Sequence, residues 1–76
     1  MSLLGPFVIL LTFTLGSHTG TDTRRVECKT MLCVADVMDQ THESRRLSRL
    51  RVFAEDYAVL PSGQTVFPPI IDLQYQ

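Results

Sequence analysis

Two cysteines are the residues of this chain best suited to chemistry, because a pair of thiols can form a disulfide or bind a metal. Cys28 and Cys33 are the only cysteines, and both lie in its polar part. In an oxidising compartment, an even pair this close in the sequence most simply bonds to itself. The chain-entropy model assigns a ring this small less than the roughly 3 kcal/mol of a loop of about 15 residues, so the bridge mainly fixes local shape. The expected ring encloses Lys29, Thr30, Met31 and Leu32.

Two other uses of these thiols stay open. Together with His18 and His42, the cysteines offer ligands that zinc accepts, but two cysteines four residues apart with one distant histidine do not match a tight zinc-finger spacing. Bonding between two chains would instead give a disulfide-linked dimer. We expect the internal Cys28–Cys33 bridge, with no metal and no other cofactor.

Paired arginines flank the expected ring. Arg24 and Arg25 come immediately before it, and Arg45 and Arg46 follow it. In an exported chain, basic pairs in polar, flexible sequence are where processing proteases cut, so the chain could be a precursor that releases residues 26–44. The alternative is that the arginine pairs are merely a solvated helix face, as runs of charge usually are. No nucleophile with a base, paired acids or phosphate-binding loop accompanies them, so an enzyme is not expected.

Residues 28–34, Cys-Lys-Thr-Met-Leu-Cys-Val, form the one segment with a family resemblance. The segment resembles the N-terminal ring of the calcitonin gene-related peptide and amylin family, which has Cys, any residue, Thr, two residues, Cys, then often Val or Ala. In that family a basic cleavage pair precedes the ring and an amphipathic helix follows it, and this chain has similar features in similar places. The resemblance implies that the ring activates a receptor while the helix docks on it. The binding residues that it implies are Lys29, Thr30, Met31 and Leu32.

An almost unbroken apolar run from Leu3 to Leu15 indicates where the chain goes. The run has the length of the apolar core of a signal peptide, and it is shorter than the roughly 20 residues that span a bilayer. We therefore expect residues 1–17 to be a signal peptide, with the cut after Gly16, after Ser17 or as late as Gly20. Residues 18–76 would then be a secreted, extracellular chain without a stable membrane anchor. The alternative is a buried strand or helix of a small cytosolic protein.

Charge and size narrow the class of partner. The chain carries seven Lys and Arg against eight Asp and Glu, a formal net charge of −1, so neither nucleic acid nor an anionic membrane is an expected partner. About 60 residues bury only about 60% of their surface, which makes a large enzyme-like pocket improbable. We expect a hormone-like or toxin-like chain that binds a protein receptor, a channel or a larger secreted partner. The alternatives are an unprocessed secreted interaction module and a truncated product of a longer secreted protein.

Two apolar stripes at helical spacing predict the elements that hold the ring. The first stripe is Val34, Val37, Met38 and Thr41, and the second is Leu47, Leu50, Ala54 and Tyr57.

From Val52 onward a β-hairpin competes with the second helix, with strands at 57–60 and 65–67 around a Pro-Ser-Gly-Gln turn. After Pro68 and Pro69, residues 70–76 should form either an extended edge or a loose tail. The expected fold is therefore small and mostly irregular or α. It consists of a signal peptide, a short disulfide ring, one or two amphipathic helices and a possible C-terminal hairpin.

Overall fold

An antiparallel sheet with one helix on one face forms the fold of this protein. The computed structural model describes residues 5–15, 20–42, 46–54, 60, 62, 64 and 66–75. In chain order, the elements are β1 (Phe7–Thr14), β2 (Thr21–Cys28), α1 (Met31–His42), β3 (Leu47–Ala54) and β4 (Ile71–Gln74). The strands lie in the order β2-β1-β3-β4, so β2 and β4 are the edges. The expectation of a mostly irregular or helical fold is wrong.

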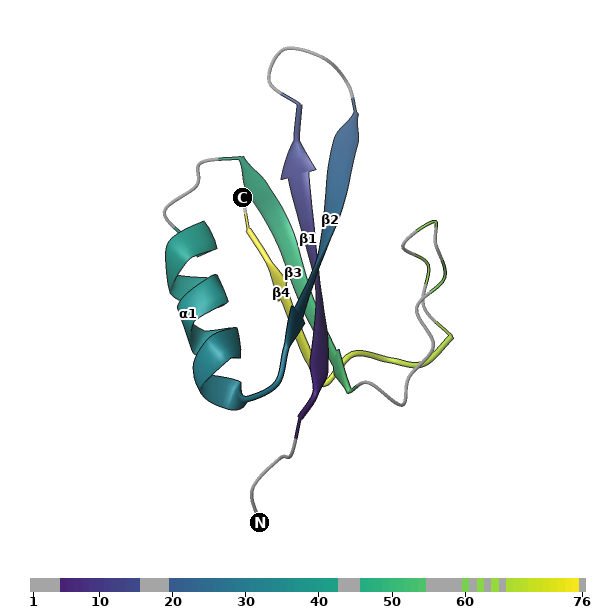
Figure 1. Ribbon diagram of the computed structural model, residues 1–76. Helices are drawn as coiled ribbons and strands as arrows, with labels where there is room; N and C mark the ends of the chain where they lie inside the picture. The colour runs from purple at the N-terminus through teal and green to yellow at the C-terminus, as the bar shows by residue number, and fades with distance from the viewer. Residues whose placement is uncertain are drawn as a thin grey trace.

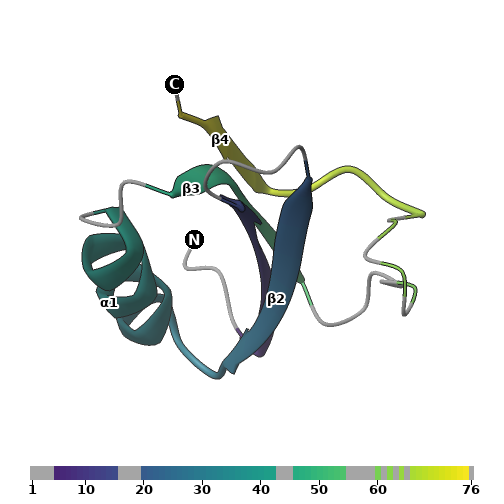
Figure 2. The ribbon, with the colours of Figure 1, turned by 90° about the horizontal axis from the view of Figure 1, so that it is seen from above.

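Helix α1 and the described residues between β3 and β4 lie on opposite sides of the sheet (Figure 1). Helix α1 covers one face, while the described part of the connection from β3 to β4 extends on the other side (Figure 1). The view from above shows the same separation, with the sheet between the two (Figure 2). The connection from β2 to α1 is short, so the ring residues lie at one end of the sheet.

Strand β1 is the centre of the sheet and its most buried element. Phe7, Val8, Ile9, Leu10 and Leu11 are each at most 4% exposed. A strand that is buried on both faces has a continuous run of apolar residues. The core of a signal peptide has the same sequence pattern. Strands β2 and β3 each pair with β1 and not with one another. A cut at any of the three expected cleavage positions would remove β1, so this sheet belongs to the uncleaved chain.

The main core lies between the sheet and α1. Val34 on the helix is fully buried, and Val37 and Met38 pack on the same cluster, so the first apolar stripe does lie on a helix. A smaller cluster on the opposite face consists of Val8, Leu10 and Phe53. The main cluster consists of Phe7, Ile9, Leu11, Cys28, Val34, Leu47, Leu50 and Val52.

The predicted second helix is wrong, because its described residues form strand β3. The pairing of β1 with β3 shifts by one residue before Phe13 and Leu47, which makes Ser48 an extra residue on β3. Side chains alternate between the faces of a strand, so one extra residue returns Leu47 and Leu50 to the same face although they are three apart. The irregularity therefore produced a helix-like spacing. The Ser48 hydroxyl donates to the carbonyl of Thr12 at 3.0 Å, which satisfies an acceptor at this point.

The end of the chain is an edge strand. Strand β4 pairs antiparallel with β3 after Pro68 and Pro69, so the extended-edge alternative is right and the loose tail is wrong. The strands of the predicted hairpin, at 57–60 and 65–67, lie largely outside the described residues. Among the residues described there, the N–H of Leu60 donates to the carbonyl of Gln64 at 2.8 Å.

Candidate functional site

The disulfide ring joins the end of β2 to the first turn of α1. Cys28 is the last residue of β2 and Cys33 lies in the first turn of the helix, and their sulfurs are bonded across a Cα–Cα distance of 5.5 Å. Cys28 is 1% exposed and belongs to the main core, on which Cys33 packs. The predicted disulfide is therefore present, and the core holds one end of the ring. In the described part of the chain, no group of three or more His, Cys, Asp or Glu side chains is placed to hold a metal ion.

Thr30 starts the helix. Its hydroxyl accepts the backbone N–H of Cys33 at 3.2 Å, and its carbonyl accepts the N–H of Val34 at 3.2 Å. This is the N-cap arrangement, which satisfies a backbone donor that the helix itself leaves unpaired. Thr30 was predicted to bind a receptor, but its hydroxyl already has a structural partner.

A close approach of backbone to backbone supports the ring from the N-terminal side. A methyl group added at Gly5 would overlap the carbonyl oxygen of Lys29. Glycine is therefore required here for space, as it is wherever two backbone segments come this close. Sequence reasoning missed Gly5, because nothing in the local sequence shows that Lys29 lies against it.

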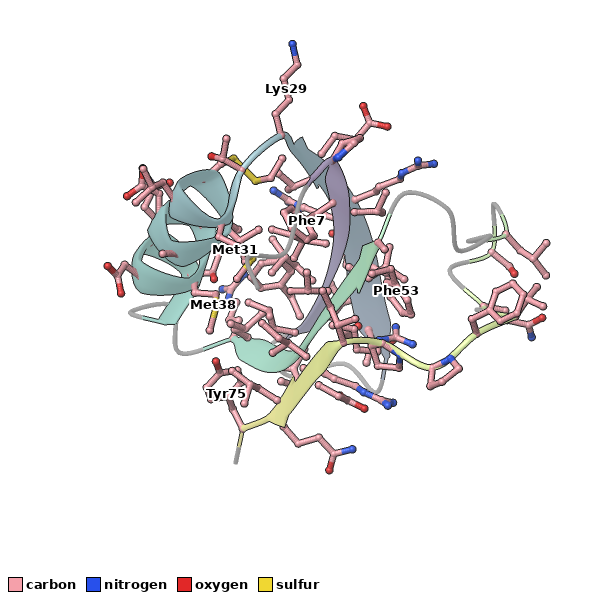
Figure 3. All side chains as sticks on the ribbon, turned by 90° about the horizontal axis from the view of Figure 1, so that it is seen from below. Phe7, Lys29, Met31, Met38, Phe53 and Tyr75 are labelled. Atoms are coloured by element: carbon pink, nitrogen blue, oxygen red, sulfur yellow. A yellow bond between two sulfur atoms is a disulfide. The ribbon has the colours of Figure 1, made fainter. Side chains whose placement is uncertain are left out.

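The ring presents its remaining side chains to solvent. Leu32 is 80% exposed, the largest exposed fraction among the large apolar side chains of the described residues, and Met31 is 37% exposed. Lys29 points away from the rest of the molecule (Figure 3). One cation and two apolar side chains are therefore offered on a loop that the disulfide and the helix cap hold in shape.

A cavity of about 590 Å³ lies beside the ring. Its volume falls within the range of roughly 300 to 1,000 Å³ that is usual for ligand pockets, so a concave site exists although the length of the chain argued against one. Glu27 and Lys29 are its ionisable lining residues, and Glu27 is paired with Arg25 at 3.1 Å. These groups and the apolar wall suit binding more than covalent chemistry. The lining residues are Gly5, Pro6, Phe7, Val8, Glu27, Cys28 and Lys29.

The first arginine pair lies within strand β2. Arg24 is opposite Leu11 and Arg25 is opposite Leu10, so the two guanidinium groups leave the sheet on opposite faces. Arg24 pairs with Asp22 at 3.3 Å. A protease needs an accessible, extended segment, so a cut here requires β2 to separate from β1.

The second arginine pair precedes β3. Arg46 lies in the turn, and its carbonyl accepts the backbone N–H of Thr14 at 2.8 Å and the hydroxyl of Thr14 at 3.3 Å. Arg45 lies outside the described residues. The ring lies at the start of α1, whereas Arg46 comes after the end of this helix. The structure therefore does not bring Arg46 and the ring together in one site.

An ion pair that the sequence did not indicate links β3 to β4. The guanidinium of Arg49 donates to both carboxylate oxygens of Asp72, at 3.0 and 2.8 Å. This bond raises the pKa of Arg49 and lowers the pKa of Asp72. Burial, followed by repulsion from Arg49, lowers the pKa of the neighbouring Arg51. The pair joins residues far apart in the sequence, so no short-range pattern could have shown it.

Comparisons with known proteins identify no relative. No protein-family model matches the chain, and no curated protein and no solved structure matches it. Among the described residues, no helix is long and apolar enough to cross a membrane. The ring and the cavity beside it are therefore the features of this chain from which a function can be inferred.

Proposed function

We propose that the intact chain is a small exported interaction module that binds a protein partner through its ring. The observation that carries this proposal is the exposure of Leu32, at 80%, on a loop closed by a disulfide. A loop already fixed in one shape loses little conformational freedom on binding, so more of the contact energy appears as affinity. The cavity beside the ring adds a place for a side chain of the partner.

The chemistry of the ring defines the partner. Leu32 and Met31 suit an apolar pocket, while Lys29 suits an acidic group at the rim of that pocket. The partner is a receptor, a channel or a larger secreted protein. The disulfide supports export, because such bonds persist in oxidising compartments.

The fold supports an intact module more than a released peptide. Arg24 and Arg25 lie in a paired strand, and Cys28 belongs to the core. Separating the ring from β1 would expose that part of the core. The hormone-like fragment covering residues 26–44 is the second candidate, and the position of β2 at a sheet edge favours it, because an edge strand separates from one neighbour only.

Intact mass spectrometry of the medium from cells that express the full chain tests this choice. A product that keeps residues 7–14 and is two hydrogens lighter than its reduced form would support the module. A product that begins after Gly16, Ser17 or Gly20, or fragments that end at Arg25 and Arg46, would support the peptide instead. Finding the chain inside the cells and not in the medium would overturn export.

Binding of the labelled, folded chain to cell surfaces tests the ring. Leu32→Asp should weaken the affinity of this saturable binding by about tenfold or more. The reason is that loss of an apolar anchor at the centre of an interface costs about 2 kcal/mol of binding free energy. Val66→Asp is the matched control, because Val66 is also apolar and 59% exposed but lies in the connection before β4. Equal loss in both variants, or in neither, would contradict a role for the ring.

A further inference from the structure

Strand β2 has an outer edge on which the described part of the chain places no other strand. Among the described strands β1 is its one neighbour. The N–H of Leu15 donates to the carbonyl of Gly20 at 3.3 Å, which marks these residues as a hydrogen-bonded pair in the register of the two strands. Hydrogen-bonded and non-bonded pairs alternate along an antiparallel ladder. The even-numbered residues of β2 therefore bond to β1, and the odd-numbered residues direct their N–H and C=O groups outward.

The charges on β2 form two pairs of opposite sign. Asp22 and Arg24 lie on the face that α1 covers, with side chains 47% and 72% exposed. Arg25 and Glu27 lie on the other face and are 54% and 74% exposed. In each pair the acid and the base lie two residues apart on one face of the strand. When an antiparallel copy of the strand is centred between them, each acid lies opposite the base of the other copy.

We propose that β2 pairs antiparallel with β2 of a second copy of this chain, with the two-fold axis at Thr23. This pairing is isologous, so each contact occurs twice. Thr23 is opposite Thr23 of the second copy, where the outward N–H and C=O groups of both residues bond to one another. Asp22 is opposite Arg24 of the second copy in non-bonded pairs, where side chains come closest, with Cα atoms about 4.5 Å apart.

The charges select this register among those that the outward groups permit. An axis at Arg24 or at Arg25 would place two arginines directly opposite one another, which is unfavourable. An axis at Val26 would pair Arg25 with Glu27, but in the wider hydrogen-bonded positions, and would leave Arg24 opposite the buried Cys28. The axis at Thr23 ends the pairing before the ring.

The other edge is a poorer site for a second copy. Strand β4 has four residues, half the length of β2. Its one charged residue is Asp72, so a second copy of β4 offers no opposite charge to it. Charges on an edge strand often prevent pairing between sheets. Charges of a single sign along β2 would have this effect. The alternating signs on β2 instead favour one antiparallel register.

Charge exchange between two variants tests the interface in the full chain. The wild type should be a dimer by analytical ultracentrifugation, and Asp22→Arg and Arg24→Asp should each be monomers at the same concentration. An equimolar mixture of the two should restore dimers, because opposite charges then meet at both positions. Restoration by mixing cannot come from the ion pair within one chain, which mixing leaves unchanged. Circular dichroism establishes that both variants fold.

Arg25→Glu and Glu27→Arg are the matched controls. Both should remain dimers, because neither residue is opposite a charge in this register. Dissociation of these two variants, restored by mixing them, would overturn the axis at Thr23. A wild type that stays monomeric up to millimolar concentration would overturn the interface altogether and make the charges a guard against pairing.

A designed cross-link tests the position of the axis directly. Hydrogen-bonded pairs place Cα atoms about 5.5 Å apart, within the distance that a disulfide spans. Thr23→Cys should therefore give a covalent dimer under mild oxidation. In the control Thr21→Cys, the two new thiols lie four residues apart along the strands, about 13 Å, and should not bond. Equal cross-linking of both variants, with Cys28–Cys33 intact by peptide mapping, would contradict the proposed register.

Discussion

The central strand β1 and the edge strand β4 are held in the same sheet by different forces. Five consecutive residues of β1 are buried, on both faces, and the strand has two neighbours. Strand β4 has one neighbour, and no side chain within it is fully buried. Among the side-chain interactions between β4 and β3, the clearest is the exposed ion pair between Arg49 and Asp72. Burial of apolar side chains therefore stabilises the centre of this small sheet, while interactions at the edges and in the ring make smaller, local contributions to the free energy of folding.

The largest effect is expected at the centre. Ile9→Ala removes a side chain that is 0% exposed from the main core, and such truncations cost about 2 to 5 kcal/mol. A single core in a chain of this size rarely supplies more than about 3 to 5 kcal/mol, so this loss is a large part of the stability. Urea denaturation followed by circular dichroism measures the loss. Leu73→Ala, on β4 and 36% exposed, is the control and should change stability by well under half as much. Equal losses would remove the distinction between centre and edge.

Removal of the disulfide should have the second-largest effect on stability. Replacing both Cys28 and Cys33 by Ala should lower the free energy of unfolding by about 2 kcal/mol, since the ring is small and Cys28 also loses its packing in the core. Thermal unfolding of the oxidised wild type, the reduced wild type and the double variant separates the two causes. Reduction alone should account for part of the loss. An unchanged melting temperature in the double variant would contradict a role in stability.

The helix cap should contribute less. Thr30→Ala removes the acceptor for the N–H of Cys33 and should cost about 1 kcal/mol. Thr30→Ser keeps the hydroxyl and should retain most of the stability. If alanine and serine behave alike in denaturant titrations, the hydroxyl is not acting as a cap.

The smallest effect is expected at β4. Asp72→Asn should cost less than about 1 kcal/mol, because exposed ion pairs contribute little. Bonding to Arg49 lowers the pKa of Asp72 in the folded chain. The contribution is therefore fully present above the unfolded pKa of about 3.9, and it is lost as the pH falls through the lower folded value. Denaturation of wild type and variant from pH 6 downward, roughly to pH 2, should show their difference shrinking only in the acidic range. A difference that is constant with pH would exclude the carboxylate as its cause.

Local features of the ring and of α1 could be read from the sequence. The spacing of Cys28 and Cys33 predicted the disulfide, and Val34, Val37 and Met38 at helical spacing lie on a helix that packs on the core. These features depend on residues a few positions apart, where chain geometry alone decides what meets. For residues 70–76 the sequence left an extended edge or a loose tail open, and only the pairing of β4 with β3 decides for the edge.

Strands β1 and β3 could not be read in this way. An apolar run such as Phe7–Leu11 has the same composition in a leader and in a central strand, and only the partners on either side distinguish them. In β3, the one-residue shift at Ser48 changed a strand pattern into a helical one, and that shift exists only when β3 pairs with β1.

The amino-acid sequence by itself determined the small ring, the amphipathic helix after it, the balanced charge and the absence of an evident catalytic motif. Tertiary structure alone decided that the apolar run becomes the middle of a sheet, that Arg24 and Arg25 lie in a paired edge strand and that Asp72 meets Arg49. The reason is physical. Ring closure and helical spacing act over a few residues, whereas strand pairing joins segments whose meeting depends on the whole chain.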